Sequence, residues 1–316
     1  MAAVRESARE AFESHRGYLW SVAYRMLGCA ADADEVLQDT FVRALESPPR
    51  RTALPWRPWL TRVAVNLARD RLRSRKRARY VGPWLPSPVE HDPIAELSTA
   101  ERQPTPAARF DLRESASFAF LLALEALTPN QRAVLLMRDV LDASLEETAD
   151  VLGLSVANVK VSHHRARKRL ASYEQERRTP SAARDQQARE ALARFMTCLA
   201  TGDLDGLQAM LAEDARLVSD GGGEFFAARV PVVGPAKIVR FLANVMAGWA
   251  ADTRYELREL NGSPAVSGEA SSEPPPGYPR RFVSRLELDR EGRIREIHTV
   301  LATRKLTSAG FDATHR

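Results

Sequence analysis

The sequence predicts a multi-domain protein in which two all-α domains, the second a helix-turn-helix, are followed by an α+β domain. The chain has 316 residues, about twice the ~150 that one domain usually takes. Six prolines between residues 80 and 108 separate two stretches with helical spacing of apolar residues. Beyond residue 180, alternating strand-like runs follow further helical segments. We expect helical domains at 1–79 and 109–176, a linker at 80–108 and the α+β domain at 180–316.

Composition excludes several classes of protein. Hydrophobic residues make up 44% and charged residues 28%, the balance of a folded chain rather than a disordered one. Uncharged stretches such as 241–251 fall short of the ~18 apolar residues that a membrane span needs. The N-terminus shows no secretory signal pattern, so we expect a cytoplasmic protein without a membrane partner. Cys29 and Cys198 are isolated, which argues against a disulfide framework and a cysteine-rich metal site.

The first domain reads as three helices. Apolar residues between Leu19 and Leu27 recur at helical spacing, and Gly28 ends that helix. A second helix is expected over 31–46, where Ser47-Pro48-Pro49 stops it. The third opens at 55–58 and continues into a run of arginines.

The second domain carries the clearest local signals. An apolar helix is expected over 110–127, and Thr128-Pro129 starts another with proline in the first turn. Ser144 and Glu147 have the spacing of a capping box for a helix to Leu152. Gly153 permits a turn, and Ser155 caps the next helix through Leu170, which predicts a helix-turn-helix.

The third domain mixes helices and strands. Helices are expected over 182–200, 204–212 and 235–249, and strands over 254–260, 281–289 and 293–301. A turn signal at 289–292 joins the last two strands as a hairpin.

Positive charge is concentrated in the first two domains. Residues 1–90 carry 16 Lys+Arg and 10 Asp+Glu, whereas 179–316 carry 18 of each. Seven basic residues lie within 69–79, and a second cluster lies within 165–169. Two basic clusters suggest two surfaces that bind a polyanion, because neutralising phosphates releases their counterions. Each run taken alone could equally be a solvated helix end.

Two helix faces in the first domain are candidate binding surfaces. The helix over 31–46 has an apolar face and an opposite face with Asp34, Glu35, Gln38 and Asp39, which suits solvent or a basic partner. On the third helix, Arg62, Asn66, Arg69 and Arg73 form a stripe, with Lys76 beyond it. Guanidinium groups hold phosphates and an amide can read a base edge, so this stripe suits nucleic acid. Trp59 lies on the apolar side, where core packing is the simpler role, while Trp56 could stack on unpaired bases.

The second helix of the helix-turn-helix has an outward arc that is polar at its start and basic further on, as in helices that enter the major groove. Its members are Ala157, Asn158, Val161, Ser162, His164, Arg165, Lys168 and Arg169. A purely structural helical hairpin is the alternative. His163 shares the inward side with Val159, and nothing pairs it with a metal ligand.

These residues resemble the extracytoplasmic-function group of bacterial sigma factors. Tyr24-Arg25-Met26-Leu27-Gly28 and Asp32-Ala33-Asp34-Glu35-Val36-Leu37-Gln38-Asp39-Thr40-Phe41 look like conserved region 2, and residues 128–170 look like conserved region 4. The resemblance implies two partners, core RNA polymerase and promoter DNA. It places Asp34, Glu35, Gln38 and Asp39 on the polymerase. The resemblance extends to Trp59-Leu60 with Asn66, Asp70 and Arg73, which look like the part of region 2 that reads the −10 element, and to this element we assign Arg62, Asn66, Arg69, Arg73 and Lys76. On the −35 element it places Asn158, Lys160, Val161, Ser162, His164, Arg165, Lys168 and Arg169.

Two further motifs are similar to those of a subgroup with a fused SnoaL-like domain, a cone-shaped α+β fold. They are Tyr80-Val81-Gly82-Pro83-Trp84-Leu85-Pro86-Ser87-Pro88 and Ser219-Asp220-Gly221-Gly222-Gly223. The likeness implies regulation by the fused domain through Trp84, Leu85, Pro86, Asp220, Gly221, Gly222 and Gly223. The chain departs from the subgroup in having Ser87 in place of Glu. It also has Ala302-Thr303-Arg304-Lys305 in place of Asn-Pro-Asp-Lys.

Other functions remain open for the C-terminal domain, which could sense an unknown small ligand, brace the chain or act as an enzyme. An acid–base pair of Asp220 and His298 is conceivable, although no sequence spacing links them. We expect no catalytic residues, cofactor or metal. The rival function for the whole chain is a helix-turn-helix regulator that binds DNA without polymerase.

Overall fold

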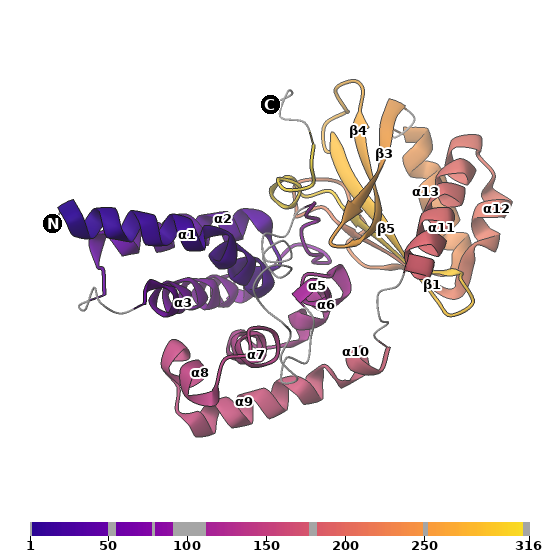
Figure 1. The fold of residues 1–316 in the computed structure, drawn as a ribbon. Coiled ribbons are helices and arrows are strands. Elements are labelled where there is room, and N and C mark those ends of the chain that lie inside the picture. The colour runs from indigo at the N-terminus through magenta and orange to yellow at the C-terminus, as the bar shows by residue number, and fades with distance from the viewer. Residues whose placement is uncertain are drawn as a thin grey trace. The chain divides into compact units, whose positions relative to one another are not determined.

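The computed structural model describes residues 2–49, 55–77, 80–90, 112–176, 182–248 and 252–311. The chain forms two compact units (Figure 1). The first comprises residues 1–79 and 92–178, and the second comprises residues 80–91 and 179–316. Of the expected linker, residues 80–90 are described and belong to the second unit, while 91–108 lie outside the described residues.

Three long helices begin the first unit and pack on one another (Figure 1). They are α1 (Ala2–Leu27), α2 (Ala30–Glu46) and α3 (Trp56–Arg77). Tyr24 and Met26 of α1, Val36 of α2 and Leu60 of α3 are fully buried. The expected helix ends are confirmed at Gly28, whose φ is 64°, and at Ser47 before the two prolines.

The prediction of a single helix over 110–127 is wrong. The described part of this interval contains α5 (Leu112–Ser115), α6 (Phe118–Ala123) and a 3-10 turn, η1 (Leu124–Ala126). Ser117 is extended and its hydroxyl accepts a hydrogen bond from the Phe120 backbone N–H. A serine that caps a new helix cannot also continue the preceding one, so the chain breaks there.

The helix-turn-helix follows the predicted caps. The segments are α7 (Pro129–Leu135), a π-helical turn η2 (Leu136–Val140), α8 (Leu145–Leu152), α9 (Val156–Arg169) and α10 (Ala171–Glu176). Ser144 and Glu147 form the reciprocal capping box of α8, and the Ser155 side chain caps α9. Gly153 ends α8 at φ 62° and ψ 40°, a left-handed conformation that favours glycine.

The second unit is a six-stranded sheet in the order β2-β1-β6-β5-β4-β3, with helices on one face (Figure 1). Its helices are α11 (Ala182–Thr201), α12 (Leu204–Ala209) and α13 (Pro235–Gly248), and Thr303–Lys305 form a 3-10 turn. The strands are β1 (Leu211–Asp220), β2 (Val232–Val233), β3 (Thr253–Leu260), β4 (Ser263–Ala270), β5 (Arg281–Leu288) and β6 (Ile294–Val300). β1 and β6 are parallel, and the other neighbours are antiparallel.

The three expected strands are confirmed as β3, β5 and β6, whereas β1, β2 and β4 were not predicted. The helix expected over 204–212 ends at Ala209, and β1 starts at Leu211. Between helices and sheet, an apolar core fills the unit. It includes Phe195, Leu207, Leu217, Ile238, Leu286 and Ile297. Within the described ranges, every helix is too short or too polar to span a bilayer.

Candidate nucleic-acid interface and linker contact

Helix α9 presents the predicted arc outward. Val159, Ala166 and Leu170 are buried and hold the helix against its own domain. The predicted contact residues Asn158, Lys160, Val161, His164, Arg165, Lys168 and Arg169 are exposed, and Ser162 is half-buried. The structure therefore brings these residues together on one accessible basic surface.

Asp139 fixes the orientation of α9. This buried carboxylate lies in η2 and accepts two hydrogen bonds from the Arg167 guanidinium, at 3.0 and 2.7 Å. The His163 Nε2 atom lies 2.7 Å from the same carboxylate, so His163 is a seam residue as predicted. Burial alone would raise the pKa of Asp139, but the hydrogen bonds from His163 and Arg167 outweigh it and hold that pKa below its ordinary value.

The arginine stripe of α3 is placed differently from the expected open surface, because it packs against the helix-turn-helix. The Arg69 guanidinium donates to the Asn130 side-chain oxygen at 2.9 and 3.1 Å and to the Leu152 carbonyl at 3.0 Å. The Asn66 amide donates to the Val151 carbonyl at 3.3 Å. Two further stripe residues reach the same domain: Arg62 lies 3.4 Å from the Asp150 carboxylate, and Arg73 lies 3.3 Å from the Asn130 oxygen. The Lys76 side chain lies outside what the structure describes.

The predicted acidic face of α2 is paired with α3. Arg71 of α3 bridges Glu35 and Asp39, donating to the Asp39 carboxylate at 2.9 Å. Burial alone would lower the pKa of Arg71, but these two carboxylates raise it above its ordinary value. Asp34 accepts a 2.7 Å hydrogen bond from the Trp20 indole, and Gln38 is exposed. The four residues share one face, and Arg71 holds two of its carboxylates in place.

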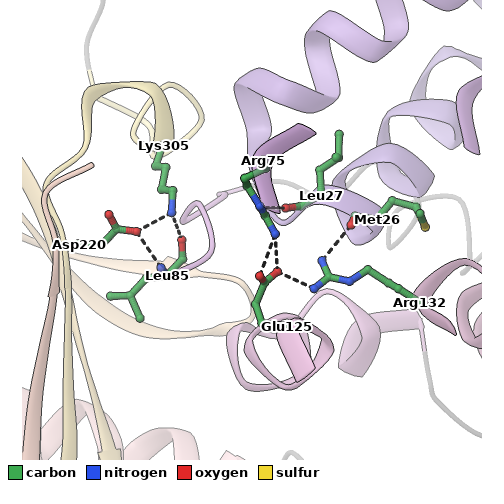
Figure 2. Close-up of polar contacts among 8 residues, drawn as sticks. All are labelled: Met26, Leu27, Arg75, Leu85, Glu125, Arg132, Asp220 and Lys305. Atoms are coloured by element: carbon green, nitrogen blue, oxygen red, sulfur yellow. Dashed lines mark hydrogen bonds and ion pairs between the residues drawn. The ribbon is translucent and has the colours of Figure 1, made fainter. Parts of the chain in front are cut away.

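Glu125 joins the two helical domains of the first unit (Figure 2). Its carboxylate accepts a hydrogen bond to each oxygen from Arg75 of α3, at 2.7 and 2.8 Å, and one from Arg132 of α7 at 2.5 Å. The two arginines also donate to the last carbonyls of α1, Arg75 to Leu27 and Arg132 to Met26, each at 2.9 Å. Burial alone would raise the pKa of Glu125, but Arg132 and Arg75 hold it below the ordinary value.

In the second unit, Asp220 at the end of β1 binds the described linker (Figure 2). Its side chain is fully buried and accepts hydrogen bonds from the Leu85 backbone N–H at 2.7 Å and from the Tyr80 hydroxyl at 2.5 Å. The Lys305 ammonium lies 2.5 Å from the same carboxylate and donates to the Leu85 carbonyl. One carboxylate thus connects a linker backbone group with a C-terminal lysine.

The remaining motif residues shape this linker contact. The Lys305 ammonium lies 4.3 Å from the Trp84 ring centroid and 4.7 Å from that of Tyr80, within cation–π range. Pro86 and Ser87 are buried. Gly222 has φ 61°, and a Cβ there would lie 2.8 Å from the Ala302 Cβ atom, so a side chain would clash. The predicted regulatory residues therefore meet at one place in the second unit.

Contacting residues absent from the predicted sets include Arg71, Glu125, Asn130 and Lys305. No sequence spacing connects the first three with their partners, because those contacts cross between helices. Lys305 had a signal, since it keeps the lysine of the otherwise altered Asn-Pro-Asp-Lys motif.

The conceivable acid–base pair of Asp220 and His298 is not formed. Asp220 pairs with Lys305, and the His298 Nε2 atom lies 2.9 Å from the Glu296 carboxylate. Among the residues that the structure describes, no group of three His, Cys, Asp or Glu residues could hold a metal ion.

Comparison with known families agrees with this arrangement. Residues 11–78 match the sigma-70 region 2 family, residues 117–170 match sigma-70 region 4, and residues 192–297 match the SnoaL-like domain. Regions 2 and 4 in this order define the sigma-70 class of proteins. The predicted fold class is confirmed, two helical domains followed by a SnoaL-like α+β domain.

Individual relatives indicate which group of the sigma-70 class the chain belongs to. The ECF RNA polymerase sigma factor SigJ of Mycobacterium tuberculosis is 35% identical over 237 residues, 74% of this chain and 72% of SigJ. The SigJ crystal structure matches with a TM-score of 0.66 at 27% identity, covering 95% of this chain and 99% of that chain. SigG of the same species is 33% identical over 220 residues, 64% of this chain and 58% of SigG. The chain belongs to the extracytoplasmic-function RNA polymerase sigma factors.

Proposed function

We propose that the protein binds core RNA polymerase and directs it to promoters with −10 and −35 elements. The observation that carries this proposal is the basic arc of α9, exposed on a capped helix that follows a region 2 domain in the same chain. A helix of this kind can enter the major groove, and its arginines can read base edges while its lysines bind phosphates. The −35 element is therefore assigned to α9.

The other two binding surfaces are proposed on region 2. The α2 face with Asp34, Glu35, Gln38 and Asp39 binds polymerase, where negative charge complements a basic partner. The α3 stripe of Arg62, Asn66, Arg69 and Arg73, continued by Lys76, binds the opened −10 strand. A protein with these partners works in the cytoplasm.

Regulation is proposed for the SnoaL-like domain, acting through the linker rather than through catalysis. The linker motif of Trp84, Leu85 and Pro86 is held by Asp220, with Gly221, Gly222 and Gly223 forming the adjoining turn.

A gel-shift assay separates this function from that of a polymerase-independent regulator. Promoter DNA selected by the assembled holoenzyme from a randomised pool is mixed with the full chain, with and without core polymerase. We expect weak binding by the chain alone and strong, specific binding with core. Equally strong specific binding without core would favour the independent regulator.

Arg165→Ala is expected to reduce affinity for the cognate −35 sequence by about 1–3 kcal/mol, because an exposed arginine can contact guanine through two hydrogen bonds. Lys168→Ala should weaken binding to cognate and scrambled sequences alike and reduce the salt slope by about 1. Arg194→Ala, an exposed arginine of α11, is the matched control. The measurement is holoenzyme binding to both sequences at several salt concentrations. Equal losses on both sequences for Arg165→Ala would contradict its role in base recognition.

A further inference from the structure

The side chains of the α3 stripe already have hydrogen-bond acceptors within the first unit. Two of its side chains, Asn66 and Arg69, donate to the backbone carbonyls of Val151 and Leu152 at the end of α8. Arg69 is 7% exposed. The centre of the surface proposed for the −10 strand is thus covered by the domain proposed for the −35 element, while Arg62 and Arg73 at its edges are exposed.

The end of α8 depends on these contacts. A helix leaves its last four carbonyls without partners inside the helix. Two of these carbonyls accept hydrogen bonds from the turn that follows: Ala149 from the Leu154 N–H group and Asp150 from the Gly153 N–H group. The carbonyls of Val151 and Leu152 accept hydrogen bonds from Asn66 and Arg69 of α3. The stripe therefore completes the capping of α8.

This set of acceptors resembles a segment of nucleic-acid backbone. The C-terminal end of a helix carries about half a negative charge, and Asp150 adds a full one beside Arg62. The oxygen of Asn130 lies between Arg69 and Arg73, where a phosphate oxygen could lie instead. Arginines that recognise phosphate thus find oxygen acceptors in similar positions inside the protein.

The internal acceptors reproduce the oxygen atoms of a phosphate but not its negative charge at Arg69. The acceptors around Arg69 are the side-chain amides of Asn130 and Asn66 and the backbone carbonyl of Leu152, which carry no net charge. Burial and the neighbouring Arg73 lower the pKa of Arg69, which Asp70 offsets only in part. A phosphate would supply the missing negative charge, so a promoter strand can compete with the internal ligand.

The α9 arc differs from the stripe, since Asn158, Arg165 and Lys168 are exposed in the same structure. The −35 contact therefore needs no rearrangement of the first unit, whereas the −10 contact does.

We infer that the end of α8 and Asn130 act as an internal substitute for the −10 strand, which closes region 2 until polymerase and promoter displace it. This inference rests on the proposed sigma-factor function. It predicts that the −35 duplex is engaged first, and that the −10 strand is bound only after α8 leaves α3.

Substitutions at Asn130 test the closure in both directions without changing the stripe or the α9 arc. The probe is a fluorescein-labelled dT20 strand, a sequence-neutral source of phosphates, added to the full chain at low salt. The apparent affinity for dT20 is the affinity of the open form multiplied by the fraction of protein that is open. Asn130→Ala should raise that fraction, so we expect it to bind dT20 about tenfold tighter. Asn130→Asp places a carboxylate beside Arg69 and Arg73, and we expect it to bind about tenfold more weakly.

A pair of changes on α8 provides the matched control. Asp150→Asn removes a charge that faces Arg62 and should tighten dT20 binding severalfold, whereas Glu146→Gln removes an exposed charge of the same helix and should leave it unchanged. Unchanged binding for Asn130→Ala and Asn130→Asp, or equal effects of the two α8 changes, would overturn the inference. Circular dichroism shows whether each variant is folded.

A second measurement follows the opening itself. Dyes are attached at Ser14→Cys in α1 and Ser172→Cys in α10, both exposed positions, in a Cys198→Ser background. Core polymerase followed by promoter DNA should lower energy transfer, and Asn130→Asp should slow that change. Constant energy transfer in a transcribing holoenzyme would overturn the inference. Failure to bind core would refute the proposed function instead, and the dT20 results on the free chain would still decide the closure.

Discussion

Asp220→Ala lowers the free energy of unfolding of the second unit by about 3–5 kcal/mol, the expected cost of removing one partner from a buried ion pair. The Lys305 side chain is 4% exposed, so its ammonium would be left with little solvation. The Leu85 N–H and the Tyr80 hydroxyl lose the same acceptor. Hydrogen exchange of the β1 and β6 amides measures the loss. Asp214→Asn, an exposed carboxylate of the same strand, is the matched control and should change little.

A second substitution separates stability from linker binding. Lys305→Met removes the buried charge, so Asp220→Ala with Lys305→Met should regain most of the lost stability. The Leu85 N–H would still have no carboxylate, and its amide should remain unprotected in the double variant. If Leu85 stays protected when Asp220 is alanine, Asp220 does not hold the linker. If Asp220→Ala is as stable as Asp214→Asn, the ion pair contributes nothing measurable.

Local signals predicted the helix-turn-helix because its chemistry lies within a few residues. The capping box of Ser144 and Glu147 and the left-handed Gly153 fix their helix ends wherever the domain sits in the chain. The break at Ser117 carried a signal of the same kind, a serine before an apolar run, but the surrounding leucines and phenylalanines suggested one continuous helix.

The strands that were not predicted show where periodicity fails. In β4, Ala265, Val266 and Ser267 are all buried, so the two-residue alternation of a half-exposed strand is lost. Asn261-Gly262 carried a hairpin signal, and both residues have positive φ in the turn between β3 and β4. The apolar residues around Leu211 suit a helix or a strand equally, so their spacing predicts a helix to residue 212 where the structure begins β1.

The sequence predicts which residues share a helix face, but not how those faces pack against one another. The wheel of α3 grouped Arg62, Asn66 and Arg69 on one face, and the structure keeps them together. That the face is covered follows from Asn130 and the end of α8, which lie more than 60 residues further along the chain. An arginine stripe has the same pattern whether its ligand is phosphate or a helix end, because both offer oxygen acceptors.

Glu125→Ala should lower the free energy of unfolding of the first unit by about 3–5 kcal/mol. The Arg132 side chain is 3% exposed and Arg75 is 21% exposed, so the substitution leaves two cations close together without their shared carboxylate. Hydrogen exchange of the α7 amides reports this loss apart from the second unit. Glu146→Ala, an exposed acid on α8, is the control and should cost no more than about 1 kcal/mol.

The same carboxylate gives the first unit a predictable response to acid. Arg132 and Arg75 hold the folded-state pKa of Glu125 below the ordinary glutamate value of 4.5, so the unfolded chain binds a proton more readily than the folded one. Its stabilisation is complete above that ordinary value and is lost as the pH falls through the lower, folded-state pKa. Glu125→Gln should therefore lower stability at neutral pH and flatten its decline in acid, measured from the α7 amide signals by nuclear magnetic resonance. An unchanged acid profile would show that Glu125 is not ionised between its two arginines, and the network would then owe its strength to neutral hydrogen bonds.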